Sequence, residues 1–165
     1  MILLMLKLDN RDIQILSILQ REGRISKTAL AARVNLSPTP CWERIKRLEE
    51  AGLIEGYNAI LSTEVLGTSA IVFMQAELAS HQARDFEIFE RAVKSMDEVL
   101  ECWAVGGGID FILKVCAGTI DEYQLFVDRM LDANIGLKRY YSYVVTKRVK
   151  ETNALPDTIL KANLE

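Results

Sequence analysis

The spacing of apolar residues changes once along the chain, near Gly67, and this change constrains the fold more than any other feature of the sequence. Before it, apolar residues recur every three or four positions, as in amphipathic helices. After it come segments in which they alternate, the first being residues 70–78, and alternation is typical of strands. We therefore expect a helical N-terminal domain followed by a C-terminal α+β domain.

Three helices are predicted in the N-terminal part. The first opens at Asp9, a suitable N-cap with a second carboxylate, Asp12, three residues later. Ser26 is the expected cap of the second helix, residues 27–34, whose alanines allow another helix to cross it closely. Residues 35–36 are a tight link to the third. Helices joined in this way follow the plan of a helix-turn-helix.

The third helix, residues 37–50, has its own start signals. The Ser37 hydroxyl can accept a hydrogen bond from a free amide of the first turn. Pro38 suits the first helical position, where its missing N–H is not needed. Apolar residues at spacings of four and three, from Cys41 to Leu48, form the buried side. The outer face and its flanks carry Thr39, Trp42, Glu43, Lys46 and Arg47.

A polar face of this kind suits the major groove of DNA. The start of the second helix would hold phosphates through hydroxyls, charge and free amides. After Gly52, a candidate for the left-handed position that ends a helix, residues 53–60 are expected to form a short hairpin or wing. The alternatives are an ordinary solvated helix and a helical hairpin used only for protein contact. The predicted DNA-binding residues are Ser26, Lys27, Thr28, Ser37, Thr39, Trp42, Glu43, Lys46 and Arg47.

The charge distribution permits this function without requiring it. The net charge is −3, but residues 1–60 carry nine basic and seven acidic residues (+2), whereas residues 61–165 carry eleven and sixteen (−5). The basic excess therefore lies in the half with the candidate DNA-reading helix.

Cysteine and histidine usage argues against a zinc site and against catalysis. The three cysteines are far apart and form no C-x-x-C motif, and His81 is the single histidine. We expect no metal, no cofactor and no enzymatic activity. The apolar opening is too short for a signal peptide, and no later run is long enough to span a membrane, so a cytoplasmic protein is expected.

The C-terminal part is predicted to alternate strands and helices in the order βαββαβ, the ferredoxin-like arrangement. Its last helix starts at a capping box formed by Thr119 and Glu122. Two helices cover only one face of such a sheet, yet the first strand is apolar on both sides from Ala70 to Met74. We expect a second copy of the chain to cover the other face. The expected domains are residues 8–60, a linker 61–68, residues 69–149, and a tail 150–165.

A turn of three glycines, Gly106, Gly107 and Gly108, separates the second and third predicted strands. It has two interpretations. Glycine permits the positive φ of a plain hairpin turn. Backbone amides exposed by glycines can also hold a carboxylate.

Several segments together carry a resemblance that runs over nearly the whole chain. They read LDNRDIQIL at 8–16, LSPTPCWERIKRLE at 36–49, GLI at 52–54, GGIDFILKV at 107–115 and YVV at 143–145. In this order and spacing the chain resembles the leucine-responsive/asparagine-synthase (Lrp/AsnC) family of bacterial and archaeal transcription regulators. The resemblance implies a winged helix-turn-helix joined to a βαββαβ (RAM, ACT-like) domain that forms homodimers, which assemble into tetramers, octamers or larger rings.

The resemblance also implies double-stranded DNA as a partner and an amino acid as effector, bound between dimers. It places the effector near the glycine turn and Asp110, with an influence from Tyr143, Val144 and Val145. Many family members have an acidic and an aromatic residue where this chain has Gly108 and Ile109. This departure is compatible with a different effector, a weaker one or none. The alternative function is an amino-acid-binding module with weak or lost DNA binding.

Overall fold

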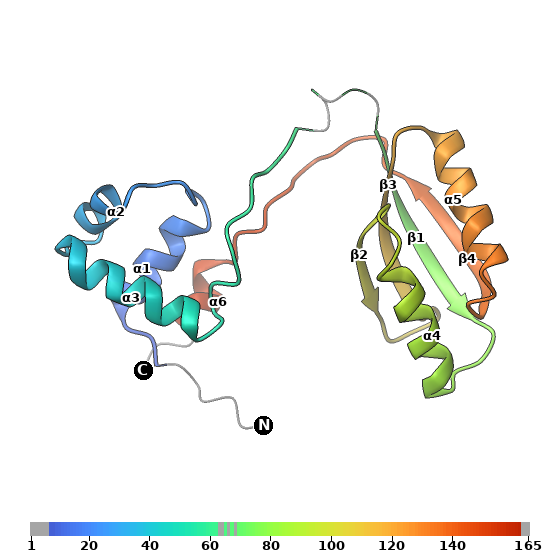
Figure 1. Cartoon of the computed structure of the whole chain (residues 1–165), viewed down its shortest axis with the longest axis horizontal. Coiled ribbons are helices and arrows are strands. Elements are labelled where there is room, and N and C mark those ends of the chain that lie inside the picture. Colours follow the sequence, from blue (N-terminus) through green and yellow to red (C-terminus); the bar gives the residue numbers. More distant parts are fainter. Residues whose placement is uncertain (1–6, 63–64, 66, 68, 163–165) are drawn as a thin grey trace. The chain divides into compact units, whose positions relative to one another are not determined.

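The computed structural model describes residues 7–62, 65, 67 and 69–162 (Figure 1). The chain forms two compact units. The first contains the described residues up to Ile60 together with those from Lys150 onwards, and the second runs from Leu61 to Val149. No described helix is long and apolar enough to cross a membrane.

The first unit contains the three predicted helices, α1 (Asn10–Leu19), α2 (Lys27–Arg33) and α3 (Pro38–Glu50). Asp9 caps α1 in a capping box with Asp12, and the Ser26 hydroxyl caps α2 by accepting a bond from the Ala29 amide. Ser37 occupies the N-cap position of α3, but its hydroxyl makes no capping bond there. That detail of the sequence prediction is therefore wrong, although the helix begins where it was expected.

Two turns, each with a residue at positive φ, end helices α2 and α3 and redirect the chain. Asn35, at φ 52°, ends α2, and the Leu36 amide donates to the Ala31 carbonyl at 2.9 Å. Gly52, at φ 72°, ends α3, and the Leu53 amide donates to the Leu48 carbonyl at 3.0 Å. Both turns close the last carbonyls of a helix in the Schellman pattern. The described residues 53–62 form no strand, so the expected wing has no hydrogen-bonded hairpin here.

The C-terminal segment belongs to the first unit and contains a short helix, α6 (Asp157–Lys161), that the sequence prediction missed. Leu160 is buried in the same apolar cluster as α1, α2 and α3. The Ser17 hydroxyl donates to Asp157 at 2.9 Å, and Gln20 exchanges two hydrogen bonds with the backbone of Leu155. The tail is therefore a structural part of the helical unit.

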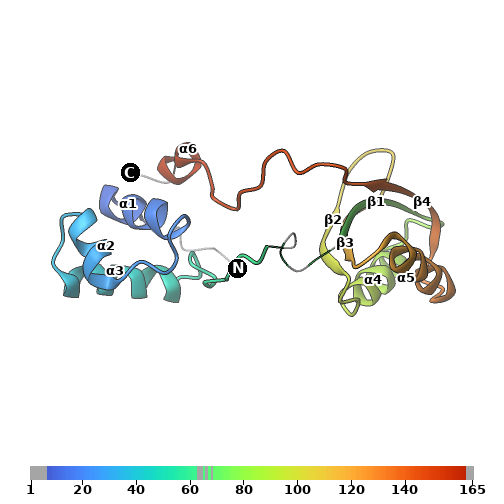
Figure 2. The ribbon, with the colours of Figure 1, turned by 90° about the horizontal axis from the view of Figure 1, so that it is seen from above.

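The second unit is the predicted βαββαβ fold. Its elements are β1 (Ala70–Leu78), α4 (Ala83–Val93), β2 (Val99–Ala104), β3 (Phe111–Ala117), α5 (Ile120–Asp132) and β4 (Leu137–Val144). The strands are antiparallel in the order β2-β3-β1-β4, so β1 and β3 are central. Figure 2 shows α4 and α5 on the same side of this sheet.

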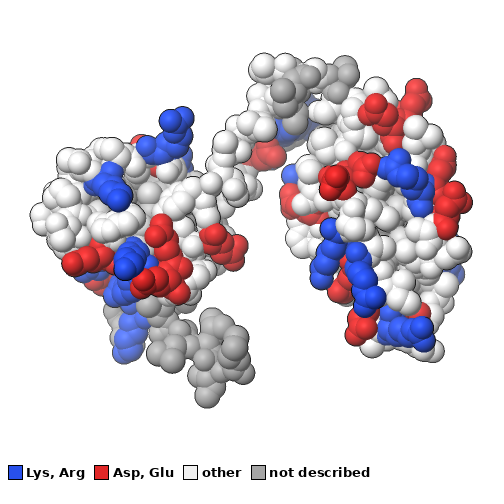
Figure 3. Space-filling model, in the orientation of Figure 1, with Lys and Arg blue, Asp and Glu red and all other residues white. Residues whose placement is uncertain are grey.

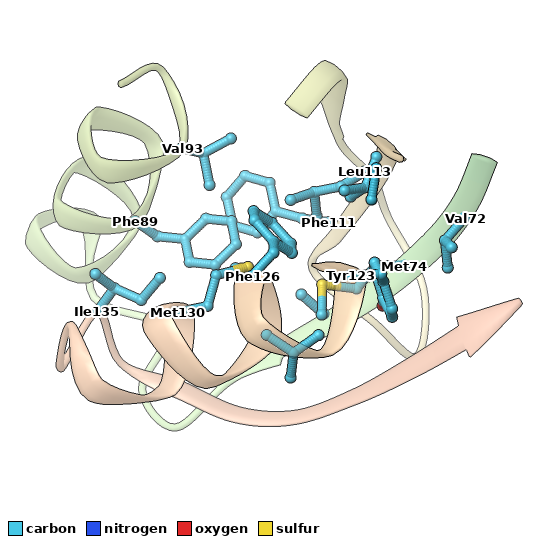
Figure 4. Close-up of a cluster of buried hydrophobic side chains, with 14 of the residues drawn as sticks. Val72, Met74, Phe89, Val93, Phe111, Leu113, Tyr123, Phe126, Met130 and Ile135 are labelled. Carbon is cyan, nitrogen blue, oxygen red and sulfur yellow. The ribbon is translucent and has the colours of Figure 1, made fainter. Parts of the chain in front are cut away.

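The core of the second unit lies between the helices and the inner face of the sheet (Figure 4). Phe89 of α4 stacks on Phe111 of β3 with ring centroids 4.5 Å apart, and Phe126 and Met130 of α5 complete the layer. Each buried aromatic ring removes a large apolar area from water, so this layer fixes the helices on the sheet.

Neither of the two helices described in this unit lies on the opposite face of the sheet. Because side chains alternate along a strand, the residues of β1 between the buried positions point to this face. The open face, as we call it, includes the exposed aromatic residues Phe73, Trp103, Tyr141 and Tyr143, with Ile71, Gln75, Ile112 and Lys114 beside them.

The packing of α6 leads to a test. Leu160→Ala should destabilise the first unit by about 2 kcal/mol, because a buried leucine loses its packing at the edge of the core. Ile159→Ala is the matched control: Ile159 is 53% exposed in the same helix, and its replacement should cost under ~0.5 kcal/mol. Urea unfolding followed by Trp42 fluorescence, in a Trp103→Phe background, measures both. Equal stability of the two variants would show that α6 does not contribute to this core.

Candidate nucleic-acid interface and effector region

A buried carboxylate fixes the candidate reading helix. Asp12 of α1 is fully buried, and it is the single buried charged residue in the described part of the chain. Its oxygens accept from Arg44 at 2.8 Å, from Arg47 at 2.5 Å and from the Asp9 amide at 3.0 Å. Two arginines one turn apart on α3 are therefore both bound to one residue of α1. A buried charge that is fully partnered in this way tolerates little displacement of its partners.

Asp9 extends the same network to the start of α1. Its carboxylate accepts from Arg44 at 2.6 Å and from the amides of Arg11 and Asp12. Burial raises the pKa of Asp9, but the hydrogen bonds from the Asp12 amide and Arg44 outweigh it and leave the pKa below the ordinary value of 3.8. The stabilisation is therefore present above that value and is lost as the pH falls through the folded-state pKa.

The network shows what the two arginines of α3 contact. Arg44 pairs with both Asp9 and Asp12. Arg47 was predicted to face DNA, but its guanidinium is bound to Asp12, with 46% of the side chain exposed. In this structure, the Arg47 guanidinium links α3 to α1.

The other predicted residues of α3 lie on its outer face. Thr39, Trp42, Glu43 and Lys46 are all exposed. Lys46 lies 3.5 Å from Glu50 across one turn, an exposed pair that water screens. Figure 3 shows acidic and basic side chains interspersed on the visible face of this unit, with no continuous basic stripe.

The start of α2 meets the same face of α3. Ser26, Lys27 and Thr28 are exposed, and the Ser26 hydroxyl already caps the helix. The Lys27 ammonium lies 3.3 Å from the centre of the Trp42 ring. Lys27 and Trp42 were predicted separately as DNA-binding residues, and the structure brings them into direct contact. Helix propensity and the spacing of apolar residues along the sequence do not indicate this pairing.

The glycine turn connects β2 to β3. Gly107 has φ +139°, which an L-residue rarely adopts, while a Cβ there would meet nothing within 4 Å. The requirement for glycine is therefore one of backbone conformation. A cavity of about 340 Å³ opens nearby between α4 and β2, and its lining includes Ala104 and Phe111, which lie at the two ends of the connection.

Asp110 fastens this turn to the end of β1. One carboxylate oxygen accepts from the Leu78 amide at 2.7 Å, and the other lies 3.2 Å from Nε2 of His81. The Asp110 amide also donates to the Ala76 carbonyl at 3.0 Å. Only 13% of the side chain is exposed. In one chain, Asp110 is therefore a structural link at this end of the sheet.

Tyr143, Val144 and Val145 lie at the other end of the sheet. Tyr143 is paired with Phe73, and Val144 with Val72, near the start of β1. Asp110 is bound at the end of β1, roughly 15 Å further along at the usual rise of a strand. One chain does not bring the two halves of the predicted effector site together. Among the described residues there is also no cluster of acidic, cysteine or histidine side chains that could hold a metal ion.

The fold and the exposed reading helix together define a helix-turn-helix DNA-binding protein with a separate βαββαβ domain. The model described as "Winged helix-turn-helix DNA-binding" matches residues 8–55, and that described as "Lrp/AsnC ligand binding domain" matches residues 71–155. The chain belongs to the Lrp/AsnC family of transcriptional regulators.

Relatives of this family match over most of their length. The transcriptional regulatory protein DoeX of Halomonas elongata is 51% identical over 90% of this chain and 94% of its own. The leucine-responsive regulatory protein of Escherichia coli is 40% identical over 90% of each chain. A crystal structure of a Neisseria meningitidis transcriptional regulator in complex with L-Met superimposes with a TM-score of 0.87 at 34% identity, covering 93% of this chain and 99% of that one. The expectation of a DNA-binding regulator is confirmed at the level of the family.

The Asp12 network can be tested by removing its charge. Asp12→Asn should destabilise the first unit by about 3 kcal/mol, because two arginines lose their buried counter-charge. Glu22→Gln is the control: Glu22 pairs with Arg33 at 2.7 Å, but both side chains are about half exposed, so the cost should stay under ~1 kcal/mol. Urea unfolding followed by Trp42 fluorescence in the Trp103→Phe background gives both values. A loss as small for Asp12→Asn as for Glu22→Gln would contradict the role assigned to this network.

Proposed function

We propose that α3 reads one half of a two-fold DNA site in the major groove, and that a second copy of the chain reads the other half. The observation that supports this best is the outer face of α3. Thr39, Glu43 and Lys46 are exposed on a helix that the ion pairs to Asp12 hold against α1. Hydroxyl, carboxylate and ammonium groups on a rigid helix can bond to base edges and to phosphates.

A single helix contacts only a few base pairs, so the two-fold site requires a dimer of fixed spacing. The open face of the sheet is the proposed dimer interface. An exposed apolar patch with four aromatic residues on one sheet face is typical of an interaction surface. Two such faces can pack as a sandwich with aligned strands, burying both patches. We propose that these dimers assemble further into tetramers or octamers, and that the protein acts in the cytoplasm.

We propose an amino acid as the effector. The family's ligand-binding domain matches this chain, and the relative from Neisseria meningitidis was crystallised with L-Met. The glycine turn offers exposed backbone amides, which suit a carboxylate. Because Tyr143 and its neighbours lie at the other end of the sheet, a site that includes both regions needs a second dimer. A ligand bound there changes the assembly only if it binds one arrangement better than another.

Sequence-specific DNA binding is tested by a footprint of the DNA that flanks the protein's own gene, with the full chain bound. The wild-type chain should protect a two-fold site. The double variant Thr39→Ala/Lys46→Ala should bind at least tenfold more weakly, because it loses a hydroxyl and an ammonium that contact base edges. Lys94→Ala removes one positive charge from the second unit and should bind like the wild type. Equal protection by all three proteins would contradict the assignment of the reading face.

Assembly and effector are tested together by light scattering. The wild-type chain should be a dimer or larger at micromolar concentration. Phe73→Asp should be a monomer, because forming the dimer would bury an unpaired charge in the interface. Leu125→Asp is the control, since Leu125 is 58% exposed on α5, away from the open face. Adding pooled amino acids should shift the wild-type size distribution or the footprint. A monomeric wild type would overturn the interface, and no response to any of the twenty would overturn the effector.

A further inference from the structure

The contact between Lys27 and Trp42 assigns these two residues a joint role. Lys27 is the first residue of α2, and Trp42 lies in the second turn of α3. Lysine side chains at a surface are long and flexible, and the charge of an unrestrained lysine is spread over many positions. Here the ammonium lies 3.3 Å from the ring centre, within the range in which the negative face of an indole attracts a cation. The ring therefore gives the charge of Lys27 a defined position.

The partner of a cationic side chain decides how much of its positive charge stays available to bind DNA. Arg44 and Arg47 are bound to carboxylates of α1, and Lys46 lies near Glu50. Within the described part of the chain, Lys27 has no carboxylate partner. An aromatic ring carries no net charge, so it orients the ammonium without neutralising it. The full positive charge of Lys27 stays available to an anion.

The same contact limits what Trp42 can do. Trp42 is 39% exposed on α3, and its position on this helix predicted a contact with DNA. One face of the ring is occupied by the ammonium of Lys27, so that face cannot pack on a thymine methyl group or on a base. A tryptophan in this position brings the first turn of α2 and the outer face of α3 together at one point of the surface.

We propose that Trp42 is a positioning residue, and that the Lys27–Trp42 pair binds one phosphate of the DNA backbone and thereby sets the register of α3 in the groove. This inference rests on the proposed reading of DNA by α3. It assigns Trp42 to backbone positioning and leaves base reading to Thr39, Glu43 and Lys46. Contacts to phosphates fix the orientation of a protein on DNA but carry no sequence information.

The test uses the full chain and a duplex that the wild-type chain selects from a random-sequence pool. Affinity is measured at salt concentrations from about 50 to 200 mM, because each neutralised phosphate adds about 0.9 to the slope of log affinity against log salt. For each copy of the chain bound to the duplex, Lys27→Gln should lower that slope by about 0.9. Affinity near 0.15 M salt should fall about fivefold for each bound copy. Trp42→Leu should change both in the same direction, and Trp42→Phe, which keeps an aromatic face, should retain most of the wild-type slope.

Two further measurements separate positioning from base reading. In the Lys27→Gln background, Trp42→Leu should have no additional effect, because the ring then has no cation to position. The preferred base at each position of the duplex should be the same for Trp42→Leu and the wild type. A changed base preference with an unchanged salt slope would overturn the proposal, as would fully additive losses or an unchanged slope in Lys27→Gln.

The controls separate this inference from the function on which it rests. Thermal unfolding of each variant should match the wild type, since both side chains are exposed. If the wild-type chain selects no duplex, the proposed reading function fails and this inference fails with it. If the chain selects a duplex and Thr39→Ala/Lys46→Ala weakens binding, but Lys27→Gln does not, only the Lys27–Trp42 proposal fails.

Discussion

The buried carboxylate of Asp12 is the interaction on which the DNA-binding unit depends. It receives two arginines of α3 and the amide that opens α1, so the first helix and the reading helix share one anchoring point. A buried carboxylate is costly unless it is fully partnered, and each partner is therefore held within hydrogen-bonding distance. The outer face of α3 can then present polar groups at defined positions, because the inner contacts leave the helix little freedom to rotate.

Most elements of this fold could be predicted from local signals. Capping residues such as Asp9 and Ser26, and the change of apolar spacing near Gly67, depend on neighbouring positions and are visible in the sequence. The roles of Arg47 and Trp42 depend on residues far away along the chain. Spacing placed Arg47 near the outer face, yet a partner thirty-five positions earlier decides where its guanidinium points. Helix α6 was missed because five residues carry too little periodicity, and because Leu160 is buried by residues far away along the chain.

The predicted effector residues show a second limit of prediction from sequence. Asp110 is bound to the end of β1, whereas Tyr143 is paired near its start. The family resemblance placed both groups at one site, and the sheet register keeps them apart in one chain. The two observations agree if the site forms between copies. The open face, which the apolar residues on both sides of β1 predicted, is the proposed first interface of such an assembly.

The return of the tail to the helical unit has a mechanical consequence. The chain leaves this unit after Ile60, forms the whole sheet domain, and comes back at Lys150 to add Leu160 to the helical core. The sheet domain is thus an insertion, joined by two covalent connections. A body held by one connection can swivel freely about it, whereas a body held by two can turn only until the connections wind around each other. The second connection ends in hydrogen bonds that join Leu155 and Asp157 to α1, so both connections lead back to the same helical unit.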